Sequence, residues 1–282
     1  MPTTSAQAST LAARRRLPLL LLVALIFSCL SSADPRGSFR EIAPGLDFAE
    51  FDSPVPAAAG ASKVIVVRAD PARLNLTLLM SSRGRGRPAT VKEWADRNGL
   101  LAAINASMYQ ADFKTSTGLM RHLGHVNNPA VNKRFGAFLL WNPANPKLPP
   151  FHMVDRDVED VKPLLKKYRS VIQNYRMIDS NRKNTWSAGG AATPIACVSV
   201  DGKGRALFIF TAALFTVRDF GEAILALPID VRTTMYVEGG PPAGLYVSAG
   251  KVKQQWSGSF DLYPLPNVLG IIKKRTETKA GA

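Results

Sequence analysis

Ile195-Ala196-Cys197-Val198-Ser199-Val200-Asp201-Gly202-Lys203-Gly204-Arg205-Ala206-Leu207-Phe208-Ile209-Phe210 is the stretch that most constrains the fold of this chain. Two apolar runs flank Asp201-Gly202, and an Asp-Gly pair between such runs is a strong hairpin pattern. We therefore predict two antiparallel strands, 195–200 and 205–210, within a sheet. Cys197 lies in the first run without an electropositive neighbour, which favours a buried core residue over a nucleophile.

Further strands and a few helices are predicted on both sides of this hairpin. Thr90 and Glu93 form a capping box that opens a helix over 90–98, and two more helices are predicted over 157–168 and 216–227. The predicted strands are 64–68, 74–79, 100–106, 135–141, 235–237 and 244–248. Because strands outnumber helices, we predict an α+β fold: a single domain with a mixed or antiparallel sheet core and a few flanking helices.

The ends of the chain differ from this core in composition. Residues 34–62 are rich in proline and alanine and are predicted to be an irregular segment before the domain at 63–272. The basic residues 273–282 are predicted to be a disordered tail.

The first 33 residues have the pattern of a secretory signal peptide. Three arginines at 14–16 precede an apolar run from Leu17 to Phe27, and Ser31-Ser32-Ala33 is a small-residue cleavage site. We expect cleavage after Ala33 and an exported, periplasmic or extracellular protein. An uncleaved anchor or lipid attachment at Cys29 would instead give membrane association through the N-terminus.

The chain is strongly basic, with a formal net charge of +15. Such a charge suggests anionic partners, among which phosphate-bearing glycans and envelope polymers fit an exported protein. A basic nucleic-acid binder would be expected in the cytoplasm, so we expect no nucleic-acid partner.

Glu238-Gly239-Gly240 is the most suggestive site loop in the sequence. A carboxylate that directly follows a strand, with two glycines after it, lets a ligand approach the backbone closely. Loops positioned by strands often carry functional sites. The alternative is a tight turn with a solvent-facing Glu238.

Other polar residues cluster near the ends of predicted strands. Asn105 ends a buried strand, and the loop that contains Arg182 and Trp186 offers an arginine for phosphate and an aromatic ring for a sugar face. His122 and His125 are three residues apart, a spacing that can suit a metal ion. The chain has only one further histidine, His152, and its two cysteines, Cys29 and Cys197, form no closely spaced pair, so we expect no metal site.

Taken in order, several segments resemble the phosphodiester glycosidase family, over about residues 60 to 250. These segments are Ala103-Ile104-Asn105-Ala106-Ser107-Met108-Tyr109, Thr117-Gly118, Val126-Asn127-Asn128, Gln173-Asn174-Tyr175-Arg176-Met177-Ile178, Val200-Asp201-Gly202 and Tyr236-Val237-Glu238-Gly239-Gly240-Pro241. The resemblance implies a hydrolase that acts on a glycosyl phosphodiester without an organic cofactor.

The resemblance also implies that Asn105, Gly118, Gln173 and the loop 238–240 line the site. From leaving-group chemistry, we expect Glu238 to face the anomeric carbon, with Asp112 as a second carboxylate. The expected catalytic residues are Glu238, Asn105 and Asp112, and the expected substrate-binding residues are Gly118, Arg121, His122, Gln173, Arg176, Arg182, Trp186, Gly239 and Gly240.

Two departures from the family pattern leave the phosphate ligand open. Many members have Asp where this chain has Glu238, and many have an arginine step before the strand that begins near Ile195. Here Ala191-Ala192-Thr193-Pro194 takes the place of that step, so we expect Arg176, Arg182 or Arg121 to hold the phosphate together with backbone amides, for which the loop Glu238-Gly239-Gly240 is a candidate. A non-catalytic envelope protein that binds anionic glycans through the same loops is the alternative function.

Overall fold

The hairpin predicted around Asp201-Gly202 is present at the centre of a large sheet. The computed structural model describes residues 37–84, 86–259 and 263–274. In it, β11 (Thr193–Asp201) pairs with β12 (Ala206–Phe215), and Cys197 lies opposite Ile209. The Asp201 carboxylate accepts two backbone N–H groups of the turn, as Asp-Gly turns commonly require. Burial raises the pKa of the Cys197 thiol, as expected for a core residue.

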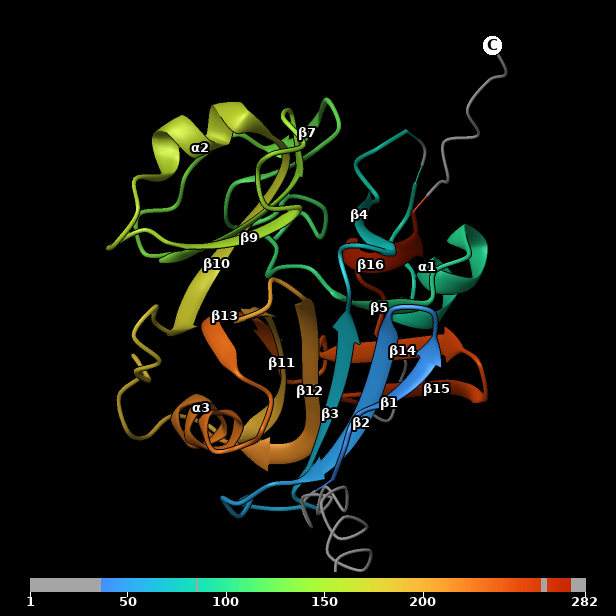
Figure 1. Cartoon of the computed structure of the whole chain (residues 1–282). Helices are drawn as coiled ribbons and strands as arrows, with labels where there is room; N and C mark the ends of the chain where they lie inside the picture. Colours follow the sequence, from blue (N-terminus) through green and yellow to red (C-terminus); the bar gives the residue numbers. More distant parts are fainter. Residues whose placement is uncertain (1–36, 85, 260–262, 275–282) are drawn as a thin grey trace, which may run out of the picture. The chain divides into compact units, whose positions relative to one another are not determined.

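The larger sheet has eleven strands in the described residues. Its other members are β1 (Arg40–Ala43), β2 (Leu46–Asp52), β3 (Lys63–Ala69), β6 (Met120–His122), β7 (His125–Asn128), β8 (Ala137–Pro143), β9 (Phe151–Asp155), β10 (Tyr168–Ile178) and β13 (Val231–Gly239). The order is β1-β2-β3-β12-β11-β13-β10-β6-β7, with β8 also paired to β10 and β9 paired to β8. The long strand β10 thus links β13 to β8, and Figure 1 shows it running from β13 toward β9.

The smaller sheet has five strands. They are β4 (Leu74–Met80), β5 (Ala102–Asn105), β14 (Gly244–Ala249), β15 (Val252–Ser257) and β16 (Asn267–Lys273), in the order β15-β14-β5-β16-β4. All strand pairs that the structure describes, in both sheets, are antiparallel.

Three short helices lie in the described residues. The capping box of α1 (Val91–Asn98) is present, since Thr90 and Glu93 exchange their predicted hydrogen bonds. The other helices are α2 (Val161–Lys167) and α3 (Val217–Leu225). Each helix packs against strands through its own apolar cluster, while a larger core cluster contains residues of both sheets. None of these helices is long and apolar enough to cross a membrane.

The described chain is therefore richer in β-structure than the α+β prediction. Residues 34–62 were expected to be irregular, but β1 and β2 occupy much of this range. Leu46, Phe48 and Phe51 are buried along β2, which pairs in full with β3. Their apolar pattern, opened by the turn at Pro44-Gly45, outweighs the prolines that follow it.

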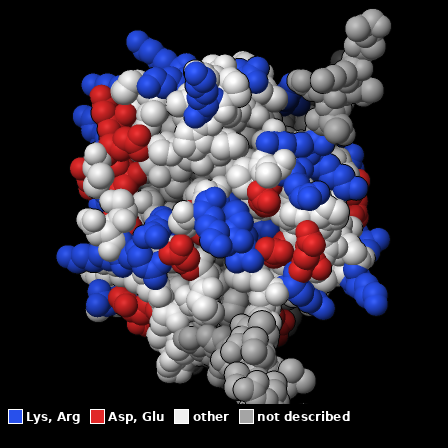
Figure 2. All heavy atoms as spheres, viewed as in Figure 1, with Lys and Arg blue, Asp and Glu red and all other residues white. Residues whose placement is uncertain are grey.

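Part of the predicted C-terminal tail is ordered. The tail prediction begins at 273, but Lys273 still belongs to β16 and the N–H of Lys274 donates to the carbonyl of Arg73. Residues 275–282 and the expected signal peptide at 1–33 lie outside the described residues. On the face drawn in Figure 2, Lys and Arg side chains are interspersed with Asp and Glu and form no continuous basic field.

Candidate active site

Glu238 lies at the end of β13, beside a place where the strand pairing is irregular. The register between β13 and β11 shifts between Ala196 and Cys197, and Ala196 lies opposite Glu238. Such a shift changes the direction in which the side chains at a strand end point. Beyond it, Gly240 has a φ of 70°, and its N–H donates to the carbonyl of Pro194 at 2.9 Å.

Gly239 is required by the crowding around it. A Cβ atom there would lie 2.4 Å from the hydroxyl of Tyr236 and 3.0 Å from Oγ1 of Thr193. The glycine thus lets the Tyr236 hydroxyl and the chain at 193–194 reach the backbone that follows Glu238.

The Glu238 carboxyl is set for a change of protonation near neutral pH. Burial raises its pKa to about 7, and the hydrogen bond from the N–H of Gly239, at 3.3 Å from Oε1, only partly opposes this. No ion pair of Glu238 is found in the part of the chain that the structure describes. Burial raises the pKa of the Tyr236 and Tyr109 phenols, so both stay protonated at neutral pH. The charge of Glu238 adds to this rise, and at Tyr109 the hydrogen bond to the Tyr263 hydroxyl contributes more than Glu238 does.

Asn105 supports the loop that follows the carboxylate. It is the last residue of β5 and is 1% exposed. Its Oδ1 accepts the N–H of Gly244 at 3.2 Å, which fixes the end of the loop that starts at Gly239. Its Nδ2 has no hydrogen-bond partner among the described residues, and an unpaired buried amide costs about 1–3 kcal/mol.

Gln173 and Gly118 meet at β10. Gly118 packs so closely that a Cβ atom would lie 2.3 Å from the carbonyl oxygen of Gln173. The Gln173 side chain is fully buried and all its hydrogen bonds go to protein: Oε1 accepts the N–H groups of Leu119 and Asn132, and Nε2 donates to the carbonyls of Asn132 and Phe135. Gln173 therefore holds the loop 132–135 in place.

The loop 132–135 contributes Lys133 and Arg134 to the wall of an open cavity of about 840 Å³. The cavity is lined by Lys133, Arg134, Gly136, Arg156, Asp157, Tyr175, Arg176 and residues 185–190. Glu238, Asn105, Gln173 and Gly118 do not line this cavity. Trp186, which does, packs against Tyr236 with ring centroids 5.4 Å apart, and Tyr236 lies two residues before Glu238 on β13. The chain at 187–190 continues directly into Thr193 and Pro194, which contact Gly239 and Gly240.

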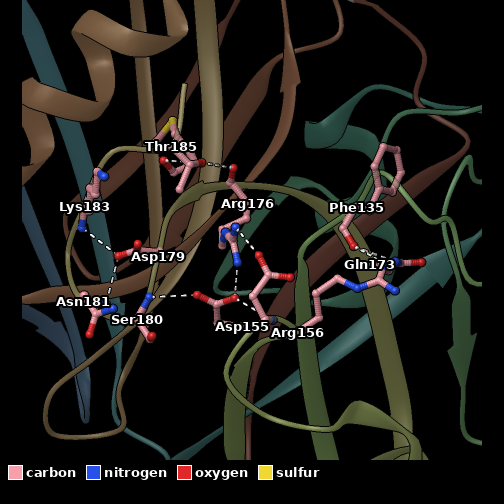
Figure 3. Close-up of polar contacts among 12 residues, drawn as sticks. Phe135, Asp155, Arg156, Gln173, Arg176, Asp179, Ser180, Asn181, Lys183 and Thr185 are labelled. Atoms are coloured by element: carbon pink, nitrogen blue, oxygen red, sulfur yellow. Dashed lines mark hydrogen bonds and ion pairs between the residues drawn. The ribbon is translucent and has the colours of Figure 1, made fainter. Parts of the chain in front are cut away.

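Arg176 lies in the cavity wall but is neutralised by protein. Figure 3 shows its guanidinium and the backbone N–H of Ser180 both directed at Asp155, which is 4% exposed. Its Nη2 also lies 2.6 Å from Oδ2 of Asp157. With two carboxylates on it, Arg176 has little free charge to offer a phosphate group.

The other predicted ligands lie at separate places, where their polar atoms are engaged. Arg121 donates to the carbonyls of Leu165 and Tyr168. Buried His122 contacts Ser170 and Thr77 and stacks on Trp141, and burial lowers its pKa to about 4. Arg182 donates to the carbonyls of Val231 and Leu225 near the end of α3. None of these three lines the cavity.

Asp112 is an exposed turn residue. Its carboxylate accepts the N–H groups of Lys114 and Thr115 and the Thr115 hydroxyl. These hydrogen bonds lower its pKa, so it stays ionised at neutral pH. Asp112 thus stabilises its own loop, and its pKa is lowered whereas that of Glu238 is raised.

Three basic residues of the cavity, Lys133, Arg134 and Arg156, were not predicted. Their sequence pattern was visible as a basic pair placed directly before the predicted strand 135–141, and as Asp155-Arg156-Asp157 at a strand end. No group of three or more metal-ligating side chains occurs within the described ranges.

The sequence model of the phosphodiester glycosidase family matches residues 98–272 of this chain. The chain belongs to the phosphodiester glycosidase family. The matched range contains Asn105, Glu238 and every residue that lines the cavity. A search of curated proteins finds no match to this chain by sequence.

Solved structures resemble it in fold. The catalytic domain of zebrafish N-acetylglucosamine-1-phosphodiester alpha-N-acetylglucosaminidase, auto-inhibited by its pro-peptide, aligns with a TM-score of 0.58 at 10% identity, covering 85% of this chain and 87% of that one. A hypothetical protein from Synechocystis aligns with a TM-score of 0.60 at 10% identity, covering 86% of this chain and 65% of that one.

Proposed function

We propose that this protein hydrolyses the bond between the anomeric carbon of a sugar and the phosphate of a phosphodiester. The observation that carries the proposal is the Glu238 carboxyl, which lies at a strand end beside two phenols, has no cationic partner in the described residues and has its pKa raised to about 7 by burial. A perturbed carboxyl of this kind is typical of a catalytic position. Membership of the phosphodiester glycosidase family supports the type of bond.

The chemistry asks for one well-placed carboxylate. A phosphate monoester leaves more readily than a sugar hydroxyl, so a strong general acid is less necessary than in ordinary glycosidases. In the proposed reaction the C–O bond breaks and its electron pair stays on the phosphate oxygen. Water adds to the anomeric carbon, and the proton it loses is taken up by the phosphate monoester or by solvent. The ionised Glu238 stabilises the positive charge that develops on that carbon, as nucleophile or as electrostatic partner.

We place the leaving phosphate next to residues 187–190, where the cavity wall runs toward Thr193. No backbone N–H of these four residues donates to another described residue, and free backbone amides bind anions well. The amides of Gly239 and Gly240, which the sequence suggested for this role, already donate to Glu238 and Pro194. Trp186 offers its ring to the sugar on the leaving side.

The reaction can be distinguished from phosphodiesterase chemistry by isotope labelling. The protein is incubated with synthetic methyl glycosyl phosphodiesters in ¹⁸O-water, and the methyl phosphate product is analysed by mass spectrometry. C–O cleavage gives methyl phosphate without the label, as we expect. Labelled methyl phosphate would mean attack at phosphorus, and binding without any product would favour the non-catalytic glycan-binding alternative.

We also propose that the protein acts outside the cytoplasm. The support is the arginine-apolar-small pattern of residues 14–33. Fractionation of producing cells followed by N-terminal sequencing tests this. We expect the exported form to begin at Asp34, and a full-length protein in the cytoplasmic fraction would contradict it.

A further inference from the structure

The large cavity has three chemically different parts. Next to Thr193 lie the free backbone amides of residues 187–190, where Gly189 and Gly190 have φ angles of 95° and 90° and open space at their Cβ positions. The second part is aromatic: Trp186 and Tyr175 both line the cavity, with ring centroids 5.7 Å apart. The third part is the loop with Lys133 and Arg134, which ends at buried Phe135, and the Phe135 ring centroid lies 4.5 Å from that of Tyr175.

This basic loop is held firmly by the buried side of the protein. Gln173 binds the loop at both of its ends, through Asn132 and Phe135. Nη1 of Arg156 donates to the carbonyls of residues 132, 133 and 135 at 3.1–3.2 Å. These six hydrogen bonds to the loop backbone preorganise the two side chains that the loop carries.

The charges of the cavity exceed what one phosphodiester requires. Arg176 is matched by Asp155 and Asp157. Lys133, Arg134 and Arg156, however, have no carboxylate partner within the described ranges. A phosphodiester carries a single negative charge, and the amides of 187–190 already suit it.

We propose that Lys133 and Arg134 bind a second phosphodiester, one sugar beyond the bond that is cleaved. The substrate class is then a glycan with successive glycosyl phosphate linkages: the first phosphate contacts the amides of 187–190, the next sugar stacks on Trp186 and Tyr175, and the second phosphate contacts the basic loop. This inference rests on the proposed hydrolase function and deepens it.

Two synthetic substrates of equal length test the inference. Both carry a cleavable glycosyl phosphodiester at one end. In one the next linkage is also a phosphodiester, and in the other it is an uncharged glycosidic bond. We expect the full chain to show a kcat/KM about tenfold or more higher for the doubly charged substrate, and this preference should shrink in high salt.

Two matched double variants test whether the preference for the doubly charged substrate depends on Lys133 and Arg134. In Lys133→Gln/Arg134→Gln the preference for the doubly charged substrate should fall to near one. Lys203→Gln/Lys253→Gln removes the same charge from exposed positions outside the cavity and should keep the preference. Cleavage without a preference, or an equal loss in both double variants, would overturn the inference while leaving the hydrolase function intact.

If neither substrate is cleaved, the proposed hydrolase function is contradicted, and the second phosphate site is then tested by binding alone. By calorimetry, the doubly charged compound should then still bind about tenfold more tightly than the singly charged one, and only the Lys133→Gln/Arg134→Gln variant should abolish the difference. Equal binding of the two compounds would overturn the second phosphate site as well.

Discussion

Glu238 and Asp112 are the two carboxylates that the sequence offered for catalysis, and their surroundings are opposite. Glu238 has one long hydrogen bond, from its neighbour's N–H, and burial raises its pKa to about 7. Asp112 is exposed and accepts three hydrogen bonds, which lower its pKa. A carboxylate whose lone pairs are already used by its own turn is a structural group, whereas one that is desolvated and unmatched is available to a substrate.

The largest expected difference between them is in activity. Glu238→Gln keeps the shape of the side chain but removes its charge, and we expect kcat/KM for a glycosyl phosphodiester to fall by about 10²–10⁴-fold. Asp112→Asn should change it by no more than about twofold. Steady-state release of free sugar measures both, and thermal unfolding confirms that both variants are folded. An equal loss in the two variants would contradict the assignment of Glu238.

The pH dependence of activity should show the raised pKa. If the ionised form of Glu238 is required, kcat/KM approaches a tenfold fall per pH unit below an apparent pKa near 7, which amounts to roughly fiftyfold between pH 7 and pH 5. Asp112, with its lowered pKa, contributes no such limb in this range. A profile that instead falls as the pH rises through 7 would mean that Glu238 works as a protonated acid.

Burial of the Glu238 carboxyl should make the folded protein less stable as the pH rises. Between its ordinary value of 4.5 and about 7, Glu238 is ionised in the unfolded chain but protonated in the folded protein. The unfolded state then binds fewer protons, so stability falls as the pH rises through this window and stays lower above it. Glu238→Gln should therefore be more stable than the parent at pH 8, by up to about 3 kcal/mol, and this gap should close toward pH 4.5.

Urea unfolding at several pH values measures that difference. Glu50→Gln is a suitable control, since Glu50 is an exposed carboxylate 3.8 Å from Lys63. A constant offset between Glu238→Gln and the parent from pH 4.5 to pH 8 would show that the carboxyl is not buried as described.

Much of the secondary structure could be predicted from patterns of neighbouring residues. The hairpin at 195–210 and the capping box at Thr90 depend on neighbouring residues, and both are confirmed. The antiparallel pairing of β1 and β2 was missed because proline and alanine in 34–62 obscured a short alternating run. Burial along β2 depends on β3, a partner that the local composition does not reveal.

The site was harder to predict because its charges are balanced over long range. Arg176 looked free in the sequence, yet Asp155 of β9, 21 positions away, neutralises it. Conversely, nothing in the sequence singled out Lys133 and Arg134, whose loop is fixed by the distant side chains of Gln173 and Arg156. Which cation is free is decided by the pairing of β8, β9 and β10, and sequence spacing does not encode it.

The smallest expected effect belongs to Asp112 and has the opposite sign to that of Glu238. Its hydrogen bonds from Thr115 and Lys114 favour the ionised form in the folded state, so it contributes stability above its ordinary pKa of 3.8, and this is lost as the pH falls through its lowered folded value. Asp112→Asn should thus be slightly less stable than the parent at pH 7, and the two should converge in acid. Because the group is exposed, the change should be well below that at Glu238. Urea unfolding of both variants at pH 7.5 gives the test in one experiment: stabilisation by Glu238→Gln together with destabilisation by Asp112→Asn supports the contrast, and shifts of the same sign would show that the two carboxylates do not differ in the way their surroundings indicate.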